Sequence, residues 1–236
     1  MTNRKPTFNV SEDGTTVEVD GTTYFLGLAD PMDVVSLRRL NFDGYFGMTA
    51  LRGQLDLIHS AHVNDNYENR GSTEGIVKVT NAFRSRILAA DTIFYLGRGL
   101  NFAIDYPKVE GGKIDVSQRS LESCLGSKQI GRIYLSDDGL VRAIPYEGKS
   151  KRTYSSNEMV ESDYPLFLTG NEEAPHQIAG IIRSLFSRGK IIFPQAEDEG
   201  LILVPALMND VNDNNTVLLS YIPHKLGGIS SFLKIN

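Results

Sequence analysis

Cysteine and long apolar runs are scarce in this sequence, and each scarcity excludes a class of protein. The single cysteine, Cys124, rules out an intramolecular disulfide framework and any zinc or iron–sulfur site built from several cysteines. The longest apolar run, 201–208, falls far short of the roughly 20 residues that cross a bilayer. Because residues 1–6 are polar, we also expect no signal peptide. We therefore expect a protein of the cytoplasm or of a virus particle, neither secreted nor bound to a membrane.

An excess of positive charge is also missing, which argues against attraction of the whole protein to nucleic acid or to an anionic membrane. The formal net charge is −5 and the pI is about 5.4. Apolar residues make up 41% and charged residues 22% of the 236 positions, as is ordinary for a globular protein. A chain of this length folds as one large domain or two smaller ones.

Motifs of enzymes are not found. The sequence lacks the nucleophile elbow Gly-x-Ser-x-Gly. Gly97 and Gly99 lie between two expected strands, whereas a phosphate-binding loop joins a strand to a helix. We expect Cys124 to be a small buried residue of its helix. The sequence therefore predicts a protein that is not an enzyme and has no cofactor.

The N-terminal third predicts strands followed by helices. Alternating apolar residues and two Asp-Gly turns predict a β-meander within residues 1–30. A short helix is expected over 31–40, and a polar loop over 64–75. Between them, apolar side chains recur at steps of three and four and predict an amphipathic helix: Met48, Leu51, Leu55, Ile58 and His62.

A unit of one helix followed by a β-hairpin recurs three times. The helices are expected at 73–90, 117–125 and 172–187. The outgoing strand of the first unit, 99–104, is repeated at 139–144 and more loosely at 200–205. Asp105-Tyr106-Pro107 also recurs as Asp163-Tyr164-Pro165, with Gly131 and Gly189 at the same offset. The alternative is that any α+β protein yields such strings.

These units predict an α+β fold in which an antiparallel sheet is built from helix-plus-hairpin units, with the helices on one face. Residues 31–155 would hold a helical segment and the first two units, and residues 156–236 the third unit and an apolar C-terminal tail. The charged, Ser-rich stretch 147–162 is the best linker candidate, so we place the boundary near Ser155.

Three sets of residues are candidates for a functional site. Asp56, His59 and His62 lie within two turns of one helix and could ligate a metal. The alternative is that His62 is a half-buried histidine beside an exposed ion pair. Basic residues on helices could face nucleic acid, or could be ordinary solvated side chains: Arg38, Arg39, Lys78, Arg84, Arg86, Arg183 and Arg188. The apolar tail could pack on its own domain or be donated to a second subunit through Ile229, Phe232, Leu233 and Ile235.

The leading hypothesis from these observations is a non-enzymatic structural or assembly protein that acts as a homo-oligomer with itself and other structural proteins, of the kind found in virus or phage particles. The first alternative is a nucleic-acid-associated protein. The chain superficially resembles a sliding clamp in size, acidity, repeated sheet units and basic helices, but clamps do not have two helices in succession as expected here at 48–63 and 73–90. The second alternative is a metal-dependent hydrolase that uses the candidate metal ligands.

Overall fold

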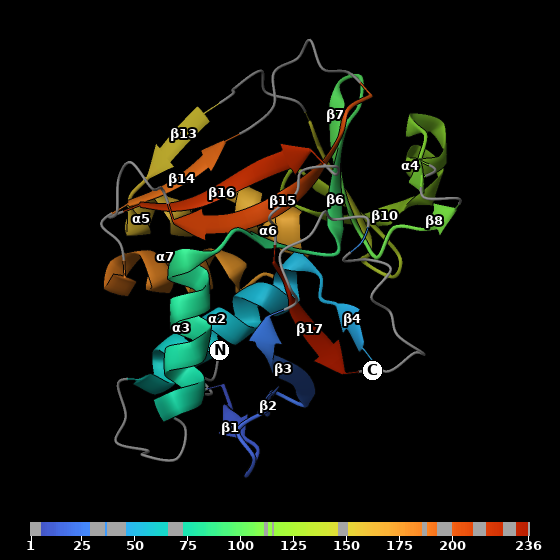
Figure 1. Cartoon of the computed structure of the whole chain (residues 1–236). Coiled ribbons are helices and arrows are strands. Elements are labelled where there is room, and N and C mark those ends of the chain that lie inside the picture. The colour runs from blue at the N-terminus through green and yellow to red at the C-terminus, as the bar shows by residue number, and fades with distance from the viewer. Residues whose placement is uncertain are drawn as a thin grey trace.

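The computed structural model describes residues 6–28, 36, 46–65, 73–110, 113–114, 116–145, 151–185, 188–192, 200–209, 216–223 and 230–235. The predicted helix at 31–40, except Ser36, and most of the predicted loop at 64–75 lie outside these residues. The described part is a mixed helix and sheet structure in which almost all strand pairs are antiparallel (Figure 1). The predicted α+β class is confirmed.

A small antiparallel sheet is formed by strands from both ends of the chain. Its order is β1-β2-β3-β17-β4. The strands are β1 (Asn9–Val10), β2 (Thr16–Val19), β3 (Thr22–Leu28), β4 (Phe46–Met48) and β17 (Phe232–Ile235). The first three strands are the predicted meander, whose second turn is made by Asp20 and Gly21 with φ angles of 46° and 83°.

A larger sheet runs through the rest of the molecule in the order β10-β11-β12-β7-β6-β15-β16-β14-β13, with β5 paired to β15. Its strands are β5 (Leu88–Ala89), β6 (Thr92–Leu96), β7 (Leu100–Asp105), β10 (Leu125–Ile130), β11 (Ile133–Ser136), β12 (Val141–Pro145), β13 (Lys151–Tyr154), β14 (Arg188–Ile192), β15 (Ile202–Asn209) and β16 (Thr216–Pro223). A separate ribbon pairs β8 (Val109–Glu110) with β9 (Lys113–Ile114). The large sheet contains strands from both sides of Ser155.

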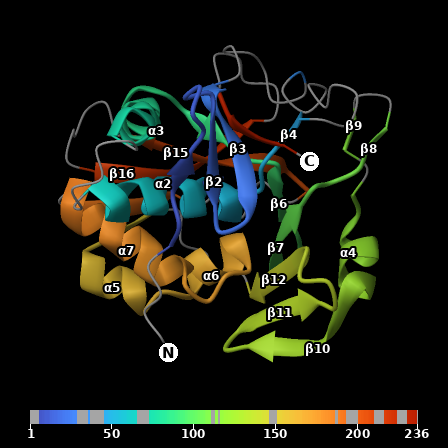
Figure 2. The ribbon, with the colours of Figure 1, turned by 90° about the horizontal axis from the view of Figure 1, so that it is seen from below.

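Helices cover both faces of the large sheet, which corrects the expectation of one covered face. They are α2 (Leu51–Asp65), α3 (Thr73–Ser85), α4 (Gln118–Cys124), α5 (Ser156–Val160), α6 (Asp163–Thr169) and α7 (Ala174–Leu185). The main core joins α2, α3, α6 and α7 to the small sheet and to one face of the large one (Figure 2). Leu121 of α4 packs on the opposite face against Ile93 and Phe102. Cys124, expected to be buried, is exposed because α4 buries Leu121.

The predicted hairpin of the third unit, in which 190–193 would pair with 200–205, is wrong. β14 runs parallel to β16 and antiparallel to β13, and it does not pair with β15. β15 pairs instead with β16, β6 and β5. The unpredicted strand β16 causes this difference, since its register with β15 extends from Val217 to Pro223 and so places it between β14 and β15.

Two further expectations about the repeat are corrected. The Asp-Tyr-Pro copies differ in structure, because Asp105 ends β7 whereas Asp163 begins α6. Helix α3 ends at Ser85, since Leu88 and Ala89 pair with β15 and are completely buried there. The stretch predicted as a linker contains β13 and α5. The matched offsets in the sequence therefore do not reflect a structural repeat.

Two hairpins share a turn that the repeat search missed. In Ser11-Glu12-Asp13-Gly14, Oδ1 of Asp13 accepts hydrogen bonds from the Ser11 hydroxyl (2.7 Å) and from the Thr15 backbone N–H (3.1 Å). In Ser136-Asp137-Asp138-Gly139, Asp138 accepts the corresponding bonds from Ser136 (2.6 Å) and from Leu140 (3.0 Å). The glycines have φ angles of 67° and 72°. These twin turns have the same local structure but lie on different sheets.

Candidate functional site

A groove of about 710 Å³ lies where the β2–β3 hairpin, α2, the end of β7, the β11–β12 turn and the α6–α7 connection come together. Figure 2 looks onto the side of the molecule on which these elements meet. The volume is within the range of roughly 300–1,000 Å³ that is usual for ligand sites. The groove is therefore large enough to be a candidate binding site.

The floor of the groove is fixed by a buried ion pair. Arg142 is completely buried, and Nη1 and Nη2 donate to the two oxygens of Asp105 at 2.7 and 2.9 Å. Its three remaining donors bind the carbonyls of Phe167 (2.8 Å) and Leu168 (3.0 Å) near the end of α6 and of Gly139 (2.9 Å) in the β11–β12 turn. A buried arginine needs this complete set of acceptors, since any unpaired charge or donor would be costly.

The ion pair also reaches α2. The Thr92 hydroxyl donates to Asp105 at 2.7 Å and accepts from the backbone N–H of Leu51 at 3.0 Å, at the first turn of α2. One hydrogen-bonded network thus ties β6, β7, β12, α2 and α6 together beneath the groove. Because every connection is short and buried, the floor is preorganised.

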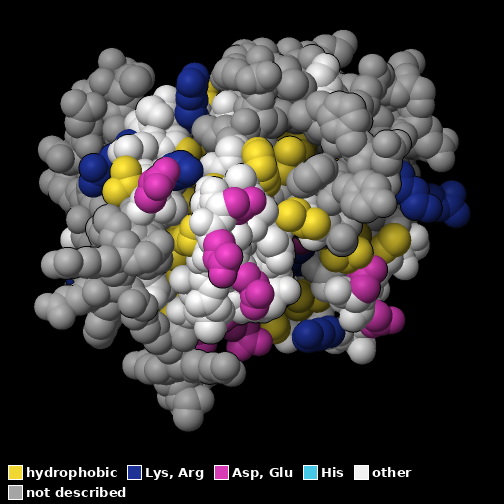
Figure 3. Space-filling model, turned by 60° about the horizontal axis from the view of Figure 1, so that its bottom comes forward, with side chains coloured by type: hydrophobic (Ala, Val, Ile, Leu, Met, Phe, Trp, Pro, Cys, Tyr) yellow, Lys and Arg dark blue, Asp and Glu magenta, His cyan; other side chains and the backbone are white. Residues whose placement is uncertain are grey.

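The described walls of the groove carry more carboxylates than cationic side chains. The carboxylates are Asp20, Asp56, Asp105, Asp137, Asp138 and Glu173, and the cationic side chains are Arg52, Lys128 and Lys234. Figure 3 shows acidic side chains across this side of the molecule. Asp105 is neutralised by Arg142, and Arg52 lies 3.7 Å from Asp56. The four remaining carboxylates outnumber the two remaining lysines, Lys128 and Lys234, so the walls keep a net negative charge that favours a cationic ligand.

Asp56 and Tyr24 have shifted pKa values within the groove. Burial, and then the neighbouring Asp20, raise the pKa of the Asp56 carboxyl, while a hydrogen bond of 2.8 Å from Gln177 and the charge of Arg52 oppose the shift. Burial also raises the pKa of the Tyr24 hydroxyl, with the Asp56 charge as the next cause. Such shifts are common at functional sites.

Tyr106 stands at the mouth of the groove in a conformation unusual for its residue type. Its φ angle is 51°, in the left-handed region that costs a non-glycine residue about 1–2 kcal/mol. Its backbone N–H donates to the carbonyl of Asp91 at 2.8 Å, and 42% of its surface is exposed. The ammonium of Lys234 lies 4.6 Å from its ring centroid. The fold therefore holds an exposed aromatic ring at an acidic groove.

The predicted metal ligands are placed on α2 but are not assembled into a metal site. Within the described ranges, no three or more His, Cys, Asp or Glu side chains come close enough together to hold a metal ion. Asp56 faces the groove and binds Gln177. His59 is half-buried beside Gly180 of α7, and burial lowers the pKa of its imidazole. His62 is half-buried.

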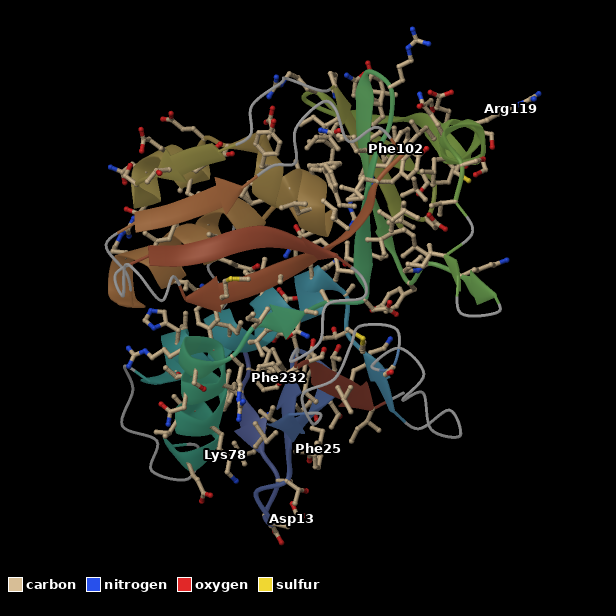
Figure 4. All side chains as sticks on the ribbon, turned by 45° about the horizontal axis from the view of Figure 1, so that its top comes forward. Asp13, Phe25, Lys78, Phe102, Arg119 and Phe232 are labelled. Carbon is tan, nitrogen blue, oxygen red and sulfur yellow. The ribbon has the colours of Figure 1, made fainter. Side chains whose placement is uncertain are left out.

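The described nucleic-acid candidates are divided between α3 with the residue just after it and α7. Lys78 on α3 pairs with Glu74 (3.1 Å) and donates to the carbonyl of Gly14, toward the β1–β2 turn seen in Figure 4. Arg84 and Arg86 are exposed at and beyond the end of α3, while Arg183 is exposed on α7, on the other side of α2 (Figure 2). The side chain of Arg188, and Arg38 and Arg39, lie outside the described residues. Nucleic-acid binding stays a prediction.

The apolar tail packs on its own chain. β17 lies between β3 and β4, and Phe232 is completely buried in the main core (Figure 4). Leu233 and Ile235 are half-buried in this sheet, and Ile229 lies outside the described residues. Of the two alternatives for the tail, the described contacts are those of intrachain docking.

Sequence reasoning missed the groove because its residues come from segments far apart in the chain. Arg142 carried one usable signal: it interrupts an otherwise apolar strand, so it required a buried partner, yet the sequence does not say that this partner is Asp105. Tyr106 lay in a motif that was interpreted as part of a repeat. Asp137 and Asp138 looked like ordinary turn residues.

Comparisons with known proteins give one distant structural likeness. No protein-family model matches the sequence, and no curated protein matches it. A solved structure described as "Accommodation of massive sequence variation in Nanoarchaeota by the C-type lectin fold" matches with a TM-score of 0.48 and 13% identity, covering 89% of this chain and 95% of that chain. A likeness this distant assigns neither a family nor an activity. Among the described residues, none of the helices is long and apolar enough to span a membrane.

Proposed function

We propose that the protein is a non-enzymatic interaction protein whose groove binds an extended basic segment of a partner protein. This keeps the expectation of a non-enzymatic protein but replaces assembly of a homo-oligomer through the C-terminal tail with binding of a partner in the groove. The observation that carries the proposal is the excess of carboxylates on the walls of the groove. Charges of one sign in a concave surface attract and orient a partner of the opposite sign.

A segment with several charges suits the groove better than a ligand with one charge. The carboxylates come from β2–β3, α2, the β11–β12 turn and the start of α7, so they are spread along the groove. A lysine- or arginine-containing chain can meet several of them at once. Each contact is partly exposed and contributes about 0.2–1 kcal/mol, so affinity has to come from several contacts together.

The twin turns provide a matched test. Asp138→Asn removes a groove carboxylate, whereas Asp13→Asn removes a carboxylate with the same hydrogen bonds at the tip of the β1–β2 hairpin, outside the groove (Figure 4). Both variants change the net charge by the same amount and alter the shared turn. Asp13 also accepts a hydrogen bond from the Thr15 hydroxyl (2.8 Å), for which Leu140 offers no equivalent beside Asp138. Binding of a fluorescent penta-lysine peptide is measured by anisotropy, with a penta-glutamate peptide as the negative control.

We expect Asp138→Asn to weaken peptide binding by about two- to fivefold and Asp13→Asn to leave it nearly unchanged. Binding should also weaken as salt is added. Equal effects of the two substitutions would mean that the peptide senses only net charge. Equally tight binding of spermine would mean that the site takes a small polyamine rather than a protein segment, and either result would contradict the proposal.

A further inference from the structure

Lys234 and Tyr106 form a contact inside the groove that the proposed function does not use. Both residues line the groove. Tyr106 directly follows β7, whereas Lys234 lies in the C-terminal strand β17. Lys234 belongs to β17, where it pairs with Tyr24 of β3 and Gly47 of β4. Its ammonium lies over the Tyr106 ring at 4.6 Å from the centroid. This distance is within the range of a cation–π interaction.

The backbone around Tyr106 is held from several directions, so the ring is placed by the fold. Asp105, the preceding residue, is locked by Arg142 and Thr92. The backbone N–H of Tyr106 donates to Asp91, whose own N–H donates to the Thr49 carbonyl beside α2. Because the backbone of Tyr106 is already fixed, no backbone freedom is lost there when a ligand packs on the ring, which favours binding.

We propose that Tyr106 is the specificity-determining residue of the groove, where it recognises a cationic side chain of the partner, and that Lys234 occupies this ring until the partner displaces it. The inference rests on the proposed function and names the residue that selects the cation. The ammonium of Lys234 already lies on the aromatic face of Tyr106. It marks the place that a lysine or arginine of the partner takes.

Occupation by Lys234 makes the groove self-inhibited. The partner's cation has to displace a side chain of this chain and also enters beside its positive charge. Removing Lys234 therefore has two effects on binding, because it frees the ring and it lowers the local positive charge. The second effect alone is produced by removing Lys128, which is an exposed groove residue on β10.

The test is a double-mutant cycle with the penta-lysine peptide. Four substitutions are measured for affinity and for thermal stability: Lys234→Met, Lys128→Met, Tyr106→Phe and Tyr106→Leu. Methionine keeps most of the lysine stem and removes the charge, and phenylalanine keeps the ring and removes the hydroxyl. The combination Lys234→Met with Tyr106→Leu completes the cycle.

We expect Lys234→Met to tighten binding by about two- to fivefold more than Lys128→Met does, because only the first frees the ring. Tyr106→Phe should bind within about twofold of the unchanged protein, and Tyr106→Leu should bind several-fold more weakly. In the Tyr106→Leu background, the gain from Lys234→Met should shrink to that of Lys128→Met.

Two results would overturn the inference in different ways. If the two lysine substitutions tighten binding equally, charge alone acts and Tyr106 has no selecting role, while the proposed function stands. If the peptide binds none of the proteins, both fail. The comparison of the two lysines does not alter the Tyr106 backbone, so it decides the question even when Tyr106→Leu is unstable.

Discussion

Arg142 is the residue on which the floor of the groove depends. Substituting Arg142 with Met leaves the Asp105 carboxylate buried without its partner and removes the donors to Phe167 and Leu168. We expect the free energy of unfolding to fall by about 3–5 kcal/mol, as is typical when a buried pair loses one member. Urea denaturation measures the loss.

Arg132→Met is the matched control for this prediction. Arg132 also pairs with an aspartate, Asp163, at 3.0 Å, but both side chains are well exposed. An exposed pair contributes at most about 1 kcal/mol. A similar loss in the two variants would contradict the view that burial makes the Arg142 pair critical.

His59 makes stability depend on pH. Its pKa is lowered below 6.5 chiefly by burial and next by His62, while Glu173 opposes the shift. The unfolded chain therefore binds more protons than the folded one just below pH 6.5. Stability is present above this pH and is lost as the pH falls toward the folded-state pKa.

We expect His59→Gln to flatten the fall in stability as the pH decreases below 6.5, measured as the urea midpoint at each pH. The raised pKa of Asp56 acts with the opposite sign, since its contribution is present below pH 3.8 and is lost as the pH rises through its folded-state pKa, so the variant is compared with the unchanged protein at every pH. His176→Gln on the exposed side of α7 is the control. An unchanged slope in His59→Gln would contradict the assignment.

At the scale of elements, α2 shows how a local rule is overridden by packing. Gly53 within this helix is about 1 kcal/mol less favourable than alanine by helix propensity. However, a Cβ at Gly53 would collide with Oγ1 of the buried Thr49 and approach the Tyr24 hydroxyl at 3.1 Å. Glycine fits here because the hydroxyls of Thr49 and Tyr24 already occupy the space that a Cβ would take.

Gly53→Ala should therefore lower stability by about 1–3 kcal/mol, the usual cost of overpacking, although the sequence alone suggests a gain. Gly180→Ala in α7 is the control, because its nearest neighbour, the His59 ring, is 3.7 Å away. This substitution should raise stability by up to about 1 kcal/mol. Thermal and urea unfolding of both variants compare the two helices.

The elements that could be predicted are those whose sequence pattern lies within one short stretch of the chain. The amphipathic helix α2, the N-terminal meander and the β6–β7 hairpin follow from periodicity and turn residues, and all three are present. Met48, which was predicted as the first apolar residue of the helix, ends β4 instead. The parallel pairing of β14 with β16 was not predictable, because partner choice is decided by packing between distant segments. The insertion of β17 between β3 and β4 has the same cause.

At the scale of the whole molecule, the α+β class was predictable and the groove was not. Composition and periodicity determine which residues are buried, but the groove forms only when the small sheet, α2 and the β11–β12 turn meet. The candidates chosen from local spacing were therefore single-element clusters such as His59 and His62. Of those candidates, Asp56 alone is among the residues that line the groove.

The central claim, that the groove binds a basic segment, is tested most directly by mapping the peptide on the protein. Amide chemical shifts of the isotope-labelled chain are recorded while the penta-lysine peptide is added. The account predicts that the largest changes fall on Tyr106, Asp137, Asp138, Asn171 and Lys234. Changes spread evenly over the acidic surface, or confined to α3 around Lys78, would contradict it.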